Sequence, residues 1–150
     1  MVTWQLTIDA NDPARMARFW APLLGYVPQP PPDGFDSWLA YSRAVVPEEE
    51  LGGDPDDYVD RLVDPAGGGP TIWFQPVPER KTGKTRFHFD VLVADRSRPM
   101  EEIVATVDAK VAELVGLGAT VGHPVRVDTG TLQRYFVLMH DPEGNEFCVA

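Results

Sequence analysis

One stretch of the sequence occurs twice, and this duplication constrains the fold more than any other feature. Residues 86–95 read RFHFDVLVAD, and residues 3–12 read TWQLTIDAND. Aligning the Asp residues that close the two stretches places His88 on Gln5. An apolar helical pattern ending in Leu-Gly follows each copy. An internal repeat of this kind predicts one supersecondary unit that the chain uses twice.

The first half opens with signals for a strand and a helix. Residues 3–9 alternate between apolar and polar types, which is the period of a strand with one face toward a helix. Asn11 or Asp12 can cap the helix that follows, and Pro13 suits its first turn. Gly25 suits the position just after the helix ends. The pattern therefore predicts a strand followed by a capped helix.

The middle of the first half is rich in turn formers and acidic residues. Residues 28–34, PQPPPDG, predict a stiff loop, and residues 37–42, SWLAYS, predict a short strand. The acidic segment at about 46–57 lacks an apolar period and contains Gly-Gly and Asp-Pro. We expect it to be the least ordered internal segment. It is either a solvated loop or a lid over a pocket mouth.

The remaining strands occur at matching places in the two halves. A DPxG turn at 64–68 recurs at 141–145, and each turn precedes a strand. After the first helix, the expected strands include 58–63 and 71–77. The second helix is expected from about 99 to 117. The strands expected after it are 120–127, 133–140 and 145–149. The second helical segment is expected to be about ten residues longer than the first, from the spacing between Asp and Gly in each copy. Both halves thus predict the order β-α-β-β-β and an α+β fold.

These motifs together resemble a known superfamily. The strand-then-Asp repeat, the helix ending FWAPLLGY and the closing DPEGNEFCV are similar to the vicinal oxygen chelate group of glyoxalases, bleomycin resistance proteins and extradiol dioxygenases. The resemblance covers residues 3–149 and is closest to the glyoxalase-like subgroup. It implies one domain, residues 1–150, built from module 1 (1–78), a flexible linker (79–85) and module 2 (86–150). The two sheets would form a half-open barrel around a pocket, and family members often form homodimers.

The resemblance also implies where a metal ion would bind. The ligand positions are the first and last strands of each module, which here carry Gln5, Gln75, His88 and Cys148. A catalytic metal wants about three good ligands such as imidazole, carboxylate or thiolate. The two Gln carbonyls are neutral, weak donors. We therefore expect no catalytic metal and no other cofactor; a divalent metal at these positions, or at Glu146 after a shift of one pair, is the alternative.

His88 is the candidate catalytic residue. It shares a strand face with Arg86 and Asp90, and a neighbouring carboxylate can make an imidazole a better base. The structural alternative is an ion pair between Arg86 and Asp90, with His88 only packed beside it. We favour the ion pair, because such pairs commonly explain triplets of this kind.

The other candidates also have structural alternatives. Trp73 shares a strand face with Gln75 and could stack on a planar ligand, or it could belong to the core. Tyr135 alternates with Phe136, and either residue could face inward. Cys148 is by default a buried, inert thiol. The candidate ligand-binding residues are thus Gln5, Trp73, Gln75, His88, Asp90, Tyr135 and Cys148.

The amino-acid composition argues against some classes of binding partner. The chain has 13 basic and 23 acidic residues and a net charge of −10, which argues against nucleic acid and anionic membranes as partners. A single cysteine excludes an intrachain disulfide and is compatible with a reducing compartment. The N-terminal residues show no signal-peptide pattern. A cytoplasmic location is expected.

Three classes of function fit these observations. The first, which we favour, is a protein that binds an unknown small molecule in the cup between the modules without a catalytic metal. The second is a metal-free enzyme that uses His88 as acid or base. The third is a metal-dependent lyase, isomerase or dioxygenase, against which the weak ligand set argues. The sequence does not separate the first two classes.

Overall fold

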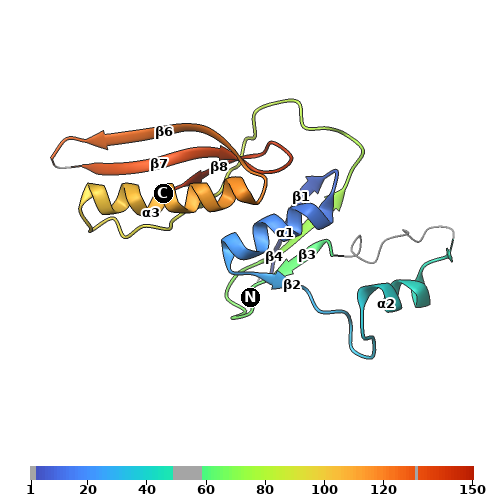
Figure 1. Ribbon diagram of the computed structural model, residues 1–150. Coiled ribbons are helices and arrows are strands. Elements are labelled where there is room, and N and C mark those ends of the chain that lie inside the picture. Colours follow the sequence, from blue (N-terminus) through green and yellow to red (C-terminus); the bar gives the residue numbers. More distant parts are fainter. Residues whose placement is uncertain (1–2, 49–58, 131) are drawn as a thin grey trace. The chain divides into compact units, whose positions relative to one another are not determined.

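The duplicated stretch contributes an edge strand to each of two four-stranded sheets, and Figure 1 labels the first of these strands as β1 (Gln5–Ala10). The computed structural model describes residues 3–48, 59–130 and 132–150. These residues form two compact units, Met1–Arg80 and Lys81–Ala150. Residues 49–57 of the acidic segment predicted to be poorly ordered lie outside the described residues, and that prediction is untested.

The two units share one sheet topology. The strands and helices of the first unit are β1 (Gln5–Ala10), α1 (Pro13–Leu24), β2 (Val27–Pro28), α2 (Trp38–Val45), β3 (Arg61–Val63) and β4 (Thr71–Pro76). Those of the second are β5 (Asp90–Val91), α3 (Met100–Gly116), β6 (Thr120–Asp128), β7 (Gln133–His140) and β8 (Glu146–Val149). The sheet orders are β1-β4-β3-β2 and β5-β8-β7-β6, with the first and last strands parallel in each. The predicted repeat is therefore confirmed at the level of topology.

Helix α1 forms as its end signals predict. The Asp12 carboxylate accepts a hydrogen bond from the backbone N–H of Arg15 at 2.9 Å, and Pro13 occupies the first turn. Gly25 ends the helix with a φ of 68°, a left-handed conformation that glycine adopts without strain. The buried face includes Met16, Phe19 and Trp20. Among the described helices, none combines the length and the apolar character needed to cross a membrane.

Residues 37–42 were predicted as a strand, and this prediction is wrong. They begin α2, because the Ser37 hydroxyl caps the helix by accepting a hydrogen bond from the Ala40 N–H at 3.1 Å. Trp38 and Tyr41 lie one turn apart and contact edge to face, with ring centroids 5.6 Å apart. Six residues are too few to separate a strand period from a helical one. The second strand of this unit is instead β2, which lies before the Pro-rich loop.

The second copy of the repeated stretch, residues 86–95, forms a shorter strand than the first copy. Strand β5 contains only Asp90 and Val91, although hydrogen bonds at Phe89 and Val93 extend its contact with β8 and Ala150. Helix α3 (Met100–Gly116) agrees with the helix predicted at about 99–117, but it has 17 residues against 12 in α1, so the predicted excess of about ten residues is too large. The spacing between Asp95 and Gly118 overstates the helix length, because Asp95 lies in the turn before α3. Its carboxylate accepts hydrogen bonds from the backbone and hydroxyl of Ser97, which form a turn before α3.

The core of the second unit lies between α3 and one face of its sheet. Helix α3 buries Ile103, Val107 and Leu114, and it contacts β7 and β8. The sheet residues buried with them are Val137, Met139, Phe147 and Val149. Residues of the other parity, including Asp90 and its register partner Cys148, share the opposite face. The sheet therefore presents polar groups on the face that α3 does not cover.

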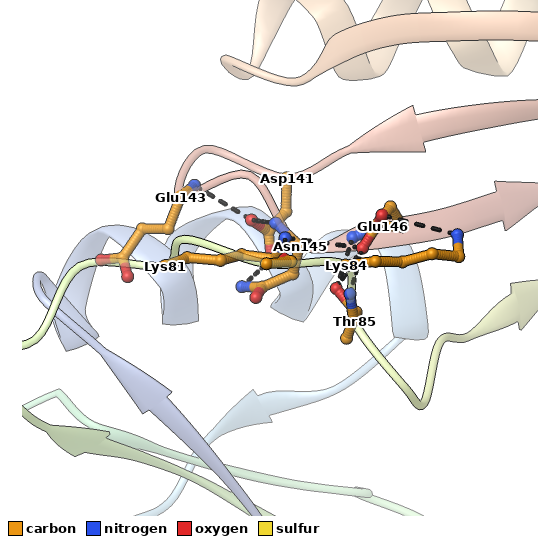
Figure 2. Close-up of polar contacts among 8 residues, drawn as sticks. Lys81, Lys84, Thr85, Asp141, Glu143, Asn145 and Glu146 are labelled. Carbon is orange, nitrogen blue, oxygen red and sulfur yellow. Dashed lines mark hydrogen bonds and ion pairs between the residues drawn. The ribbon is translucent and has the colours of Figure 1, made fainter.

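The segment predicted as a flexible linker, residues 79–85, is partly held by contacts with β8. Figure 2 shows that the Glu146 carboxylate binds the segment 81–85 to the start of β8. It accepts hydrogen bonds from the Thr85 hydroxyl and from the Thr85 N–H, the latter at 2.7 Å. Lys81 and Lys84 lie 3.5 and 3.6 Å from its oxygens. This segment therefore belongs structurally to the second unit.

Candidate ligand-binding site

A cavity of about 330 Å³ lies in the second unit beside β5 and β8. His88 and Asp90 line it from the β5 side, Cys148 from β8 and Ile103 from α3. Residues 133–136 of β7 also line it, because Val137 pairs with Val149 and β7 continues beyond the last pair of β8. The volume is near the lower end of the range for small-molecule sites. This cavity brings together four of the residues predicted from the sequence: His88, Asp90, Tyr135 and Cys148.

Three of these side chains form a polar cluster. The Nε2 atom of His88 lies 3.3 Å from Oδ1 of Asp90. Cys148 is the direct register partner of Asp90 across the parallel pair. One potential donor atom from each of the three residues lies within 4.8 Å of the others. The parallel pairing of β5 with β8 therefore builds the cluster from positions distant in sequence.

The contact between His88 and Asp90 differs from the structural alternative raised by the sequence. Among the described ion pairs, Asp90 contacts His88 rather than Arg86. The two side chains are 49% and 64% exposed, so an incoming ligand can reach them. A carboxylate at one ring nitrogen holds the imidazole in a defined orientation. The pair can therefore present an oriented hydrogen-bonding group to the cavity.

Cys148 enters this cluster as a thiol. Burial raises its pKa, and the charge of Asp90 together with a hydrogen bond to that carboxylate raises it further. The reactive form of cysteine is the thiolate, which this environment disfavours. The expectation of a buried thiol of low reactivity is consistent with this environment. Cys148 is suited to contribute a hydrogen bond and a polarizable surface.

Tyr135 is fixed by the helix. Its hydroxyl donates a hydrogen bond to Oδ1 of Asp108 on α3 at 2.7 Å. Burial, followed by the hydrogen bond and charge of Asp108, raises the pKa of Tyr135 to about 12. Val137 and Met139 have the same parity as Tyr135 and are buried, so this set of β7 side chains lies on the helix side of the sheet. Because the hydroxyl proton is already donated to Asp108, we infer that Tyr135 contributes its ring to the cavity lining.

The three predicted residues of the first unit lie on the neighbouring strands β1 and β4. The Gln5 side chain is exposed and donates to the Thr7 hydroxyl at 3.3 Å. Trp73 is half-buried, and its indole N–H donates to Asp60 at 2.8 Å. The Arg61 guanidinium lies 5.0 Å from the Trp73 ring centroid, so a cation already stacks on this ring. A site that joins these residues to those of the second unit stays a prediction.

The strand register changes one predicted equivalence. Thr7 pairs with Trp73 in the first unit, and Asp90 pairs with Cys148 in the second. Because the repeat places Thr7 on Asp90, Trp73 rather than Gln75 corresponds to Cys148. Gln75 pairs with Asp9 further along the strand. The connection between the DPxG turn and the last strand is longer in the first unit, which the repeat alone does not reveal.

The donor set does not fit the four-ligand metal site that the resemblance implies. Gln5 and Gln75 offer only neutral amide oxygens, and the raised pKa of Cys148 keeps its sulfur protonated. A metal would have to displace that proton, at a cost that increases with the thiol pKa. His88 is then the one strong donor among the four.

Sequence reasoning missed two cationic residues of the cavity. Arg96 follows β5 and Arg134 belongs to β7, and both line the cavity. Arg134 occupies an alternating strand position and Arg96 follows the Asp that closes the repeat, which is only a weak signal. Long-range strand pairing, which sequence periodicity does not report, places them together.

Comparison with known proteins identifies relatives along nearly the whole chain. A family model described as a glyoxalase-like domain matches residues 5–150. A glyoxalase/bleomycin resistance protein/dioxygenase family enzyme from Burkholderia phytofirmans has a TM-score of 0.57 at 17% identity, covering 97% of this chain and 94% of that one. Fosfomycin resistance protein FosX from Mesorhizobium loti has a TM-score of 0.53 at 14% identity, covering 99% and 92%. A glyoxalase-related enzyme from Fulvimarina pelagi has a TM-score of 0.53 at 16% identity, covering 100% and 86%. No curated protein sequence matches the chain.

Proposed function

The chain belongs to the glyoxalase-like domain family, and from this premise we propose that it binds a small organic molecule in the cavity of its second unit, without a catalytic metal. The observation that carries this proposal is the convergence of His88, Asp90 and Cys148 on one cavity that also has an apolar wall. Concave sites of this kind bind small molecules through a few polar groups that fix orientation.

Each part of the cavity has a role in this proposal. His88, oriented by Asp90, exchanges a hydrogen bond with the ligand. Ile103 and Phe136 contact its apolar portion. The Cys148 thiol lies beside His88 and Asp90 and completes the polar part of the cavity lining. The protein acts in the cytoplasm in this proposal, consistent with its single cysteine, and the family resemblance favours a homodimer.

The first prediction concerns metal content. Protein purified without chelators is expected to contain far less than one equivalent of Zn, Fe, Mn or Ni, because the Gln amides are weak donors and Cys148 stays protonated. Elemental analysis by mass spectrometry measures this directly. The His88→Ala variant is expected to have the same low content.

One observation favours a second candidate function. The donor atoms of His88, Asp90 and Cys148 lie within 4.8 Å of one another, which is compatible with a shared ion if the thiol loses its proton. Near-stoichiometric metal that disappears in His88→Ala would overturn the metal-free proposal. The metal-dependent class would then become the better description.

The second prediction concerns binding. In ¹H–¹⁵N NMR titrations with a set of small organic acids, amides and alcohols, shifts are expected to concentrate at the cavity residues. Replacing His88 with alanine is expected to weaken binding about tenfold, the typical effect of losing one hydrogen bond. His123→Ala is the matched control, because His123 is exposed on β6 and lies outside the cavity.

This titration also separates binding from catalysis. A bound compound that is converted by the wild type, and is bound but not converted by His88→Ala, would assign His88 as an acid or base. Shifts scattered outside the cavity, or equal effects of the two His substitutions, would contradict the proposed site.

A further inference from the structure

Two arginines line the cavity from different elements. Arg96 belongs to the turn after β5, and Arg134 belongs to the part of β7 that continues beyond β8. The chain has 23 acidic but only 13 basic residues. The whole chain is negatively charged, whereas this cavity is lined by two positively charged guanidinium groups. These two positive groups favour a ligand that carries a negative charge.

Neither arginine is neutralised by another described residue. Arg98 pairs with Glu102 at 2.8 Å and Arg61 with Asp60 at 3.6 Å, whereas no ion pair joins Arg96 or Arg134 to any part of the chain that the structure describes. Asp90 is the acidic side chain among the described lining residues, and His88 and Cys148 already contact it. The cavity thus retains positive charge for a ligand.

The cavity also has apolar lining residues. Ile103 and Phe136 contribute hydrocarbon surface beside the polar groups. Guanidinium groups bind carboxylates through two parallel hydrogen bonds, and such charge-assisted bonds are stronger than neutral ones. We propose that the cavity selects a small carboxylate with an apolar portion, and that Arg96 and Arg134 hold its anionic group. This inference rests on the proposed function and specifies its class of ligand.

Matched acids and amides test this inference. The probes are cinnamate with cinnamamide, phenylacetate with phenylacetamide, and hexanoate with hexanamide, which differ mainly in charge. Binding is measured by ¹H–¹⁵N NMR titration of the full chain at low and high salt. Each acid is expected to bind at least about tenfold more tightly than its amide at low salt, and added salt is expected to reduce this preference.

Substitutions assign the preference to the two arginines. Arg96→Gln and Arg134→Gln are each expected to weaken acid binding about tenfold and to leave amide binding unchanged. Arg98→Gln is the charge-matched control, because Arg98 lies outside this cavity and pairs with Glu102. The NMR spectrum of each variant also reports whether it is folded.

The outcomes distinguish the two proposals. Equal binding of acids and amides at the cavity, or an unchanged acid preference in both cavity variants, would overturn the anion inference and leave the proposed function standing. If no member of any pair shifts the cavity signals, both the inference and the proposed binding function are wrong.

Discussion

Replacing Glu146 with glutamine is expected to lower the free energy of unfolding of the second unit by about 1.5–3 kcal/mol at pH 7, the usual range for hydrogen bonds to a charged group. The Glu146 side chain is only 13% exposed, so few new hydrogen bonds with water can compensate for the lost interactions of the carboxylate. Its carboxylate joins Thr85 to the start of β8 and lies near Lys81 and Lys84 (Figure 2). The neutral amide keeps the shape but removes the charge. Urea denaturation followed by circular dichroism measures the loss.

The same interaction predicts a specific dependence on pH. The hydrogen bond from the Thr85 hydroxyl, that from its N–H, and the charge of Lys81 lower the pKa of Glu146 from 4.5 to about 2. A carboxyl whose pKa is lower in the folded state contributes stability above its unfolded pKa and loses it as pH falls through the folded value. The difference between wild type and Glu146→Gln is therefore expected to be full above about pH 5 and to shrink between about pH 4.5 and 2.

Glu101→Gln is the control for this prediction. The Glu101 side chain is 83% exposed, and its contact with Arg126 is 3.8 Å long. An exposed ion pair of this kind contributes less than about 1 kcal/mol. Equal stability losses in the two variants, or a loss in Glu146→Gln that does not change between pH 7 and pH 3, would show that the carboxylate does not hold residues 81–85 as inferred.

Replacing Phe147 with alanine is expected to destabilise the second unit by about 3–5 kcal/mol, the cost of truncating a fully buried Phe. Phe147 is 0% exposed and lies in β8, next to the cavity residue Cys148. All four Trp residues lie within the first unit, so the core of the second unit contains no Trp of its own. Amide hydrogen exchange at residues 133–149 is the suitable measurement, and protection there is expected to fall sharply.

The chain contains a matched control for this truncation. Phe87→Ala removes the same atoms from a side chain that is 89% exposed in the same unit. Its effect on amide protection is expected to stay within about 0.5 kcal/mol, as for most surface substitutions. A large loss in Phe87→Ala would mean that this side chain is covered in solution, and a small loss in Phe147→Ala would contradict the described core.

The sequence alone determined the repeated architecture and much of its local structure. The two aligned stretches predicted two units of one topology, and the sheets have the same strand order and the same parallel edge pair. Asp12 and Gly25 marked the ends of α1 correctly. The alternation that puts Trp73 and Gln75 on one face of β4 agrees with its burial, because Ile72 and Phe74 are buried on the other face. These features depend on neighbours a few residues apart, and local periodicity and capping therefore report them.

Tertiary structure decided how the candidate site is assembled, although His88, Asp90, Tyr135 and Cys148 were predicted from the sequence. Strand pairing placed Cys148 beside Asp90, showed that Trp73 and not Gln75 matches Cys148, and brought Arg96 and Arg134 to one cavity. A shift of one residue in a strand register reverses the face of every side chain, and no local pattern specifies the partner strand's register. Residues 37–42 differ for a related reason: a strand period and a helical period are not distinguishable over six residues, so the Ser37 cap and the packing of Trp38 on Tyr41 decide the conformation.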